Sequence, residues 1–463
     1  MTDNSDNASD TGSLRYAVNN ATSGSDTINF SGVVGTITLT NGTLTINNNV
    51  TIIGPGAAML TISGNNVATV FTITGGSTVS ISELNIAHGN GEYSGGIYDE
   101  GTLTIDKCAF SGNTATVFGG AIFNQGSLTV NRSTFSGNTG GAAGAIESYF
   151  ETAVVSNSVF FGNTANGYGT IYNKSGNLTV NNSTFSGNRS ASGGGIANDI
   201  SGALTVNNST ISGNTASSSG GGIANISGTV TVTNSIVAGN TEPTAGDDCD
   251  LCGTQGTNNL ISTTSDVITP DLGPLQYNGG RTETMMPLPG SSGIICQGSG
   301  STLATDQRGF ARSTSGASDL GAVQTNYLMV TTLSDSTDTT TCTGGATCSL
   351  RDAITTADSA GSGDIVFQSG LTGTISLGST LPPINGNVNL AGPGAKMLSI
   401  SGGRTYSVLD ISNANAVVNL SGLSITNGSV STPGLGAGLS NEGLLLVESC
   451  NFVFNDGVEG GGI

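Results

Sequence analysis

The sequence predicts an all-β protein whose chain winds into a right-handed parallel β-helix with three-strand coils of about 25 residues. One motif, an apolar–polar–apolar run followed by a larger apolar residue and then Asn, recurs through residues 103–240. Apolar and polar residues alternate within each copy, which is typical of strands, and the helical i, i+3, i+4 spacing is absent from the motif. The copies start at Leu103, Leu128, Ala153, Leu178, Leu204 and Val230, a period of 25 or 26 residues.

Stacking of the coils places equivalent residues roughly 4.8 Å apart, so residues of one kind form columns. We expect three inward columns from this motif: Leu103 to Val230, Ile105 to Val232, and Phe110, Phe135, Phe160 and Phe185 followed by Ile211 and Val237. A second motif, which we call the glycine motif, ends in an Ile that is expected to close the third side of the core, at Ile122, Ile146, Ile171, Ile196 and Ile223. A column of small residues, Cys108, Ser133, Ser158, Ser183, Ser209 and Ser235, is also expected to point inward. Asn113, Asn138, Asn163, Asn188, Asn214 and Asn240 are expected at a bend, in left-handed conformation, with amides bonded along the stack.

The domain order expected from the sequence is two tandem solenoids with short capping helices. Residues 1–242 form the first β-helix with its cap, 243–327 its closing segment, and 328–463 a second, truncated β-helix. Ser13–Ala21 has helical spacing and is expected to cover the first coil, because an uncapped end would expose strand edges. Cys348–Ile354 repeats that segment about 336 residues later, which predicts the second module.

Composition limits the partners of the chain. With 11 Lys and Arg against 31 Asp and Glu, the net charge is −20, so nucleic acid and anionic membrane surfaces are poor partners. A transmembrane segment is not expected, since the longest apolar runs are far too short. Met1–Asp6 does not resemble a signal peptide, and the chain stops within a repeat. We therefore expect a fragment of a protein of the extracellular space or bacterial cell surface, with the outer membrane as one such surface.

The seven cysteines do not form a dense disulfide framework. Cys249 with Cys252 and Cys342 with Cys348 are close enough in sequence to close small loops in an oxidising compartment; their redox state stays open at this point. Cys108 and Cys450 occupy the inward small-residue column and are expected to be buried thiols. Cys296 has no obvious partner.

Three groups of motifs resemble known bacterial surface proteins. Gly119–Ile122 (Gly-Gly-Ala-Ile) and Phe110–Asn113 (Phe-x-x-Asn) resemble the repeats of polymorphic membrane proteins, which are autotransporter-type β-helical adhesins. Cys348–Ile354 resembles the N-terminal signature, of the CSLREA type, of bacterial right-handed β-helix surface proteins; the first copy has Gly12 in place of its Cys. Leu272–Gly309 resembles a choice-of-anchor C-terminal segment. The resemblance implies adhesion or structural display and no defined catalytic site.

The function expected from these observations is non-catalytic. An extended face of Asn, Ser, Thr and Tyr suits weak multivalent contacts with a surface carbohydrate or protein, by an adhesin or structural stalk that is monomeric. The sequence predicts no catalytic residue, no cofactor and no metal ligand.

One alternative is a polysaccharide lyase or glycoside hydrolase on a pectate-lyase-like β-helix. A lyase of this shape needs a basic proton abstractor and an acidic calcium cluster, and a hydrolase needs converging carboxylates. Glu147 and Glu151, near Tyr149 and Phe150, are the best hydrolase candidate. A solvated loop is the more common explanation for such a pair.

Three further features of the sequence bear on chemistry. His88, the single histidine of the chain, lacks partners for a triad or a multi-histidine metal site and is expected in a turn. Asp247–Asp250 could bind calcium but lacks the spacing of a dedicated loop, so a solvated turn is favoured. An ice-binding surface is a second alternative, from the outward column Thr104, Thr129, Thr179, Thr205 and Thr231; Val154 interrupts it, and ladder stability explains it better.

Overall fold

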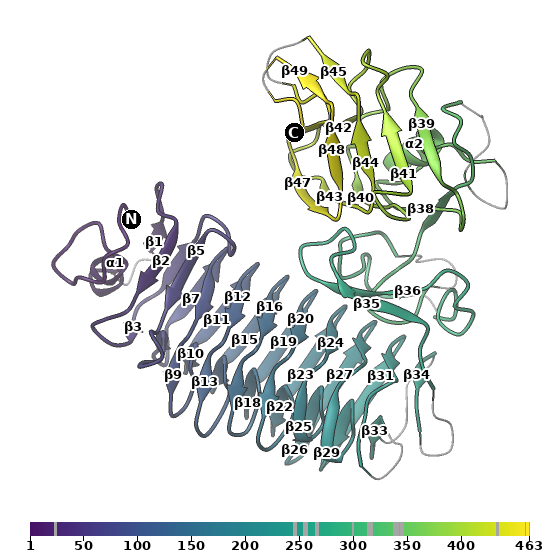
Figure 1. The fold of residues 1–463 in the computed structure, drawn as a ribbon. Helices are drawn as coiled ribbons and strands as arrows, with labels where there is room; N and C mark the ends of the chain where they lie inside the picture. Colours follow the sequence, from purple (N-terminus) through teal and green to yellow (C-terminus); the bar gives the residue numbers. More distant parts are fainter. Residues whose placement is uncertain are drawn as a thin grey trace. The chain divides into compact units, whose positions relative to one another are not determined.

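A computed structural model describes residues 1–22, 26–243, 248–252, 258–263, 268–298, 301–312, 318–336, 342, 347–431, 435–458 and 460–462. The chain forms two compact units (Figure 1). Unit 1 comprises Met1–Leu275, Gly290–Thr302 and Ser313–Val323, and unit 2 comprises Gln276–Pro289, Leu303–Arg312 and Gln324–Ile463. The segment expected to close the first module is thus divided between the two units.

Unit 1 is a parallel β-solenoid built from three long sheets and one short sheet, which we name A to D (Figure 1). Each regular coil contributes one strand to each sheet, and the strands pair in parallel with the coils before and after. This arrangement confirms the predicted parallel β-helix.

The strands of sheet A, in order, are β1 (Asp26–Asn29), β4 (Val50–Ile53), β7 (Thr78–Ser82), β11 (Thr102–Asp106), β15 (Ser127–Asn131), β19 (Thr152–Ser156), β23 (Asn177–Asn181), β27 (Gly202–Asn207) and β31 (Gly228–Thr233). Sheet B contains β2 (Gly35–Thr38), β5 (Leu60–Ser63), β8 (Asn85–Ala87), β12 (Ala109–Ser111), β16 (Thr134–Ser136), β20 (Val159–Phe161), β24 (Thr184–Ser186), β28 (Thr210–Ile211), β32 (Ile236–Val237) and β34 (Leu260–Ile261). Sheet C contains β3 (Leu44–Ile46), β6 (Phe71–Ile73), β10 (Ile97–Asp99), β14 (Ile122–Asn124), β18 (Ile146–Tyr149), β22 (Ile171–Lys174), β26 (Ile196–Asp199), β30 (Ile223–Asn225) and β33 (Cys249–Asp250). Sheet D contains β9 (Asn90–Gly91), β13 (Thr114–Ala115), β17 (Thr139–Gly140), β21 (Thr164–Ala165), β25 (Arg189–Ser192) and β29 (Thr215–Ser219).

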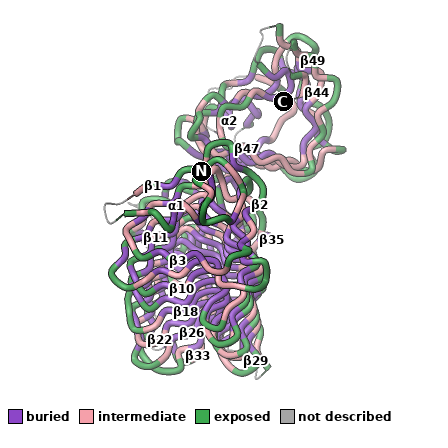
Figure 2. Tube along the Cα trace, turned by 90° about the vertical axis from the view of Figure 1, so that its left-hand side faces the viewer, coloured by how far each residue is buried: buried purple, intermediate pink, exposed green. Residues whose placement is uncertain are grey.

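The predicted inward columns form the core of unit 1. Phe110, Phe135, Phe160 and Phe185 pair in register and are fully buried. Their rings stack nearly parallel, with centroids 4.7, 4.6 and 4.6 Å apart along the file. Figure 2 shows buried residues recurring from coil to coil along this solenoid. A narrow apolar column can stabilise so long a chain because each coil packs on its two neighbours.

The Asn column forms the expected ladder of buried amides. The Oδ1 atom of Asn138 accepts hydrogen bonds from the backbone N–H and from Nδ2 of Asn113, each at 3.0 Å. The Nδ2 atom of Asn138 donates to the carbonyl of Phe110 at 3.0 Å and to Oδ1 of Asn163 at 2.9 Å. Each amide therefore bonds the backbone and the Asn side chain of the preceding coil, and also the Asn side chain of the next coil, so its polar atoms are satisfied although they are buried.

The expected left-handed conformation of these Asn residues is wrong. Positive φ falls on the glycine that precedes each Asn, for example Gly112 at +61°, because a glycine adopts this conformation without Cβ strain. The Asn can then direct its amide into the stack. The corner between sheets A and B also uses positive φ, at Lys107, Arg132, Asn157, Asn182, Asn208 and Asn234.

The helix α1 (Leu14–Asn19) caps the first coil, as the helical spacing predicts. Ser13 is its N-cap and accepts a hydrogen bond from the Tyr16 N–H, and Leu14 and Val18 are buried in the core. Arg15 forms a buried ion pair with Asp6 at 2.6 Å and donates to the carbonyls of Gly42 and Thr43, just before β3. The cap is thereby fixed to the open end of sheet C.

Residues near the end of unit 1 cover the outer face of the last strands of sheet B. Ile294 and Leu320 pack with Ile236 and Ala238 in a small apolar cluster. Gly321 lies at φ +87° and a Cβ there would meet the Ile236 side chain at 2.8 Å, so only glycine fits.

Unit 2 is a shorter parallel solenoid with its own apolar core. Its longest sheet contains β37 (Tyr327–Val330), β38 (Ser362–Phe367), β40 (Asn387–Ala391), β43 (Val417–Ser421) and β47 (Leu444–Glu448). A second sheet contains β39 (Gly373–Ser376), β41 (Leu398–Ser401), β44 (Ser424–Thr426) and β48 (Asn451–Val453). Two strand pairs are β42 (Leu409–Ile411) with β46 (Leu439–Asn441), and β45 (Ser429–Val430) with β49 (Asp456–Gly457). The chain passes between the units within β35 (Leu272–Gln276), and β36 (Thr284–Pro287) belongs to unit 2.

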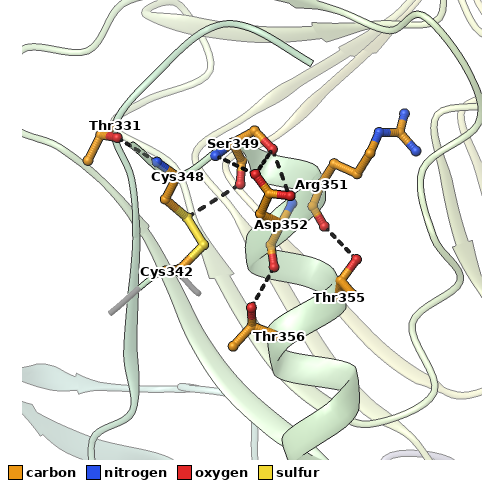
Figure 3. Close-up of a disulfide and its surroundings, with 8 residues drawn as sticks. All are labelled: Thr331, Cys342, Cys348, Ser349, Arg351, Asp352, Thr355 and Thr356. Atoms are coloured by element: carbon orange, nitrogen blue, oxygen red, sulfur yellow. Dashed lines mark hydrogen bonds between the residues drawn. A yellow bond between two sulfur atoms is a disulfide. The ribbon is translucent and has the colours of Figure 1, made fainter. Parts of the chain in front are cut away.

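The helix α2 (Leu350–Ala360) caps unit 2 in the same way as α1 caps unit 1. Ser349 and Asp352 form a capping box, and Cys348 beside them is joined to Cys342 by a disulfide (Figure 3). Arg351 pairs with Asp335 at 2.8 Å, as Arg15 pairs with Asp6, and also donates to two carbonyls of the following coil. The predicted repetition of the capping segment is therefore confirmed at the level of side-chain contacts.

The Asp306–Phe310 run contributes two members of a buried ion triad, Asp306 and Arg308. The Arg308 guanidinium lies 2.9 Å from Asp306 and 2.6 Å from Asp364, with all three side chains inaccessible to solvent. The Phe310 ring packs against Arg308 at 3.8 Å. The run thus contributes to the interior of unit 2 and offers no open charged surface.

Candidate functional site

The candidate site lies on the outer face of sheet C in unit 1. Along β10, β14, β18 and β22 the isoleucines point inward, and strand alternation directs the next residue outward. These outward residues are Tyr98, Phe123, Glu147 and Tyr172, which lie in register in four successive coils. Three aromatic rings and one carboxyl group are thereby brought into one column, although 24 or 25 residues separate each from the next.

A second layer of rings comes from the loops that precede these strands. Tyr93 stacks on Tyr98 with centroids 5.4 Å apart, and Phe118 on Phe123 at 4.3 Å. Tyr93 and Phe118 also stack on each other at 5.5 Å, so the four rings form one array. Two coils further on, Tyr168 stacks on Tyr172 at 4.4 Å. We call Tyr93, Tyr98, Phe118, Phe123, Phe150, Tyr168 and Tyr172 the aromatic strip.

The strip combines exposed rings with buried rings beneath them. Tyr93 is 46 % exposed, Tyr168 37 % and Phe150 60 %, while Phe123 and Tyr172 are buried. Burial of the lower rings holds the upper ones in place. Several large apolar side chains exposed on one face of a soluble protein commonly mark a binding surface.

Polar side chains line one side of the strip. Glu100, Gln125, Tyr149, Lys174 and Asp199, which we call the polar rim, occupy equivalent positions in five successive coils.

Two rim carboxylates fix the hydroxyl groups of strip tyrosines. The Tyr98 hydroxyl donates to Oε1 of Glu100 at 2.6 Å, and the Tyr172 hydroxyl donates to Oδ2 of Asp199 at 3.1 Å. Burial, with these carboxylates, raises the pKa of both tyrosines, so they stay neutral donors. The Lys174 ammonium lies 4.9 Å from the Tyr149 ring centroid, a cation–π contact.

Glu147 is the unusual member of the column. It is 1 % exposed, and among the described residues neither carboxylate oxygen has a hydrogen-bond partner. Burial raises the pKa of Glu147 to about 7, with the ammonium of Lys174 acting in the opposite direction. The carboxyl group therefore exists in both protonation states near neutral pH. An unpartnered buried polar group is costly, and such groups are retained preferentially at functional sites.

The two carboxylates of the hydrolase candidate expected from the sequence differ in exposure. Glu147 faces outward from β18 beneath the strip, and Glu151 is exposed in the turn that follows this strand. Tyr149, at the end of β18, and Phe150, which follows it, do lie close together, with ring centroids 4.0 Å apart. Of the two, Glu147 is the buried one, and its raised pKa suits acid–base chemistry near neutral pH.

The inward columns expected from the sequence do not predict most of the aromatic strip. A signal was present. In three coils an aromatic residue follows the Ile of the glycine motif, at Tyr98, Phe123 and Tyr172. In the same coils another aromatic residue precedes the glycines, at Tyr93, Phe118 and Tyr168.

The other candidate residues form no second site. His88 is exposed in a turn at φ +50°. Asp247 lies outside the described residues, and Asp248 is buried and accepts a hydrogen bond from the Asn240 N–H at 3.0 Å, which extends the Asn ladder. The expected solvated turn is therefore wrong for Asp248, whose pKa burial raises to about 7. Over the part of the chain that the structure describes, no three His, Cys, Asp or Glu residues cluster as metal ligands would.

Both close cysteine pairs form disulfides, with Cα atoms 5.6 Å apart for Cys249–Cys252 and 5.1 Å for Cys342–Cys348. Cys108 is a buried thiol as expected, and burial raises its pKa to about 12. Cys450 occupies the equivalent position in unit 2 but is only partly buried, because no described coil covers it from the far side. Cys296 is exposed, and within the described ranges it has no disulfide partner.

The outward Thr column also lies in register, with Val154 between Thr129 and Thr179. The interruption seen in the sequence is thus present on the surface of sheet A.

Comparisons with known proteins identify no family. No protein-family model and no curated protein matches the chain. Solved structures similar to it include a PL6 family alginate lyase, AlyGC, at 13 % identity over 96 % of this chain and 77 % of the lyase, with a TM-score of 0.24. A point mutant of that lyase gives 12 % identity over 95 % and 77 %, with a TM-score of 0.20. Similarity this low carries no information about activity.

Neither helix in the described part of the chain is long and apolar enough to span a membrane.

Proposed function

We propose that unit 1 is a non-catalytic glycan-binding module that uses the aromatic strip and its polar rim. The exposed rings of Tyr93, Phe150 and Tyr168 on one face of the solenoid carry the proposal. The C–H faces of a sugar ring are apolar and pack against aromatic rings, whereas its hydroxyls need polar partners at the edge. The rim residues Gln125 and Asp199 supply such partners.

The arrangement suits an extended ligand. The strip runs through four successive coils, so several sugars of one chain can be contacted at once. Contacts that are weak individually add when they are linked in one ligand. This supports binding of a polymer in preference to a free monosaccharide. Of the expected face of Asn, Ser, Thr and Tyr, the proposal keeps the tyrosines and adds phenylalanines.

An extracellular or cell-surface location, and an adhesin-like or stalk role, are part of the proposal. Two disulfides are typical of an oxidising compartment, and the low content of basic residues suits a protein outside the cell. A binding face on a rigid solenoid would serve attachment to a polysaccharide surface.

Binding of oligosaccharides to the full chain, measured by calorimetry, tests the proposal. Tyr93→Ala and Tyr168→Ala are each expected to weaken binding about tenfold, since buried contact with an aromatic anchor typically carries more than 1 kcal/mol. Phe454→Ala is the matched control, because Phe454 is 75 % exposed and lies in unit 2. Unchanged affinity in both tyrosine variants, or loss in the control alone, would contradict the proposal.

Glu147 favours a second candidate function, cleavage of a polysaccharide. Its pKa of about 7 fits a general acid, and the aromatic strip would hold the chain beside it. A hydrolase needs a second carboxylate across the bond, for which Asp199 is a rim candidate. Incubation with pectin, alginate and chondroitin, with detection of reducing or unsaturated ends, tests this; turnover that is lost in Glu147→Gln would replace the binding proposal.

A further inference from the structure

The charges around the aromatic strip are mostly negative. Glu100 and Asp199 belong to the polar rim, Glu92 directly precedes Tyr93, and Glu151 directly follows Phe150. Of the five rim residues, only Lys174 is basic, and its ammonium already lies over the Tyr149 ring. A polyanionic ligand would approach a surface of its own sign, on a chain whose net charge is −20.

The Glu147 carboxylate can accept hydrogen bonds that no described group of the protein donates. Both of its oxygens lack a partner within the described structure, and it lies in one column with Phe123 and Tyr172. A carboxylate accepts hydrogen bonds only, so the group that would complete it is a donor such as a sugar hydroxyl. A second carboxylate brought by the ligand would instead repel it.

We propose that the aromatic strip binds a glycan without acidic groups, and that Glu147 accepts hydrogen bonds from the hydroxyls of one sugar. This inference rests on the proposed glycan-binding function and names its ligand class. Because Glu147 is 1 % exposed, the sugar reaches it after the side chains beside it rotate outward. Side-chain rotation of this kind is common when a ligand docks on a preformed surface.

Binding by this route is linked to proton release. Hydroxyl donors favour the ionised form of Glu147, so a bound neutral glycan lowers the pKa of this carboxyl group from about 7. Affinity is then expected to rise about tenfold between pH 5.5 and pH 8. The titratable groups that interact with Glu147 are Lys174 and Tyr172. Burial raises the pKa of Tyr172 above its ordinary value, so its hydroxyl stays protonated between pH 5.5 and pH 8.

The experiment compares matched hexasaccharides on the full chain at low salt: neutral N-acetylglucosamine and glucose hexamers against a galacturonic acid hexamer. We expect at least one neutral hexamer to bind at least tenfold more tightly than the uronate. The difference in affinity between the neutral hexamers and the uronate should become smaller in 0.5 M salt, which screens surface charge. Glu147→Gln should flatten the pH dependence of neutral binding, whereas Glu151→Gln, which removes one exposed carboxylate, should leave it in place.

Equal or tighter binding of the uronate would overturn this inference and leave the glycan-binding function standing. A pH dependence that persists in Glu147→Gln would overturn the role of Glu147. If no hexamer of either charge binds, the proposed function itself fails, so the two failures are distinguishable.

Discussion

Replacing Asp99 by Asn is expected to stabilise unit 1 at neutral and alkaline pH and to have little effect at acidic pH. Asp99 is fully buried at the end of β10, in one column with Asn124 of the next coil. Its Oδ1 atom accepts a hydrogen bond from the Gly101 N–H at 2.9 Å, and Oδ2 has no partner in the described structure. Asn124 makes the equivalent bond with Gly126, so an amide fits this position.

The magnitude follows from the pKa of the buried carboxyl group. Burial raises the pKa of Asp99 from 3.8 to about 7. The folded state therefore favours the protonated form, and its stability falls as the pH rises from the unfolded pKa near 4 to the folded value near 7. At about 1.4 kcal/mol per pKa unit the full penalty above pH 7 is roughly 4 kcal/mol, and local relaxation reduces it to about 2–4 kcal/mol. Asn carries no such penalty.

Urea unfolding of the full chain at pH 4, 6 and 8, followed by circular dichroism, measures the effect. Asp99→Asn should raise the free energy of unfolding by about 2–4 kcal/mol at pH 8 and by less than about 1 kcal/mol at pH 4. Asn124→Asp is the reciprocal control and should lose stability mainly at pH 8. Equal effects of Asp99→Asn at pH 4 and pH 8, or destabilisation at pH 8, would refute the assignment of a costly buried carboxylate.

Three further substitutions probe contacts inside each unit, two in unit 1 and one in unit 2. Asn163→Ala removes an amide that bonds both neighbours in the buried ladder and should destabilise unit 1 by about 2–5 kcal/mol, measured by urea unfolding; a loss below about 1 kcal/mol would contradict the ladder. Phe135→Ala leaves a cavity between two stacked rings and should cost about 3–5 kcal/mol in the same assay, and an unchanged unfolding midpoint would argue against a packed file. Arg308→Met leaves the Asp364 carboxylate buried without its cation and should lower the stability of unit 2 by about 3–5 kcal/mol at pH 8, with partial recovery at acidic pH as Asp364 is protonated; recovery at alkaline pH would contradict this account.

The repeating features of unit 1 could be predicted because each coil carries the same motif and buries its apolar side chains at the same positions. Phe110 and Phe135 occupy the same place in the motif, so a fixed period and a parallel stack are enough to bring them together. The same argument predicts the amide ladder of Asn113 and Asn138. It fails for the backbone: the sequence does not show whether the glycine or the Asn of a Gly-Asn pair takes the positive φ, because both residues tolerate it.

The candidate site was only partly accessible from the sequence. Glu147, Tyr149 and Phe150 stand close together in the chain and could be singled out. Tyr93 and Tyr168 belong to loops three coils apart, and their exposure depends on how each loop folds over sheet C. Glu147 is buried, which raises its pKa, and its neighbours in register are Phe123 and Tyr172 of the adjacent coils.

The sequence by itself determined the strand class, the coil length, the inward columns and the repeated cap, since these follow from periodicity and from the need to bury apolar side chains. Only the tertiary structure decided which outward residues form one surface and which carboxyl group is shielded from water. The physical reason is that desolvation and exposure depend on neighbours about 25 residues away, and no local pattern specifies how those neighbours are oriented.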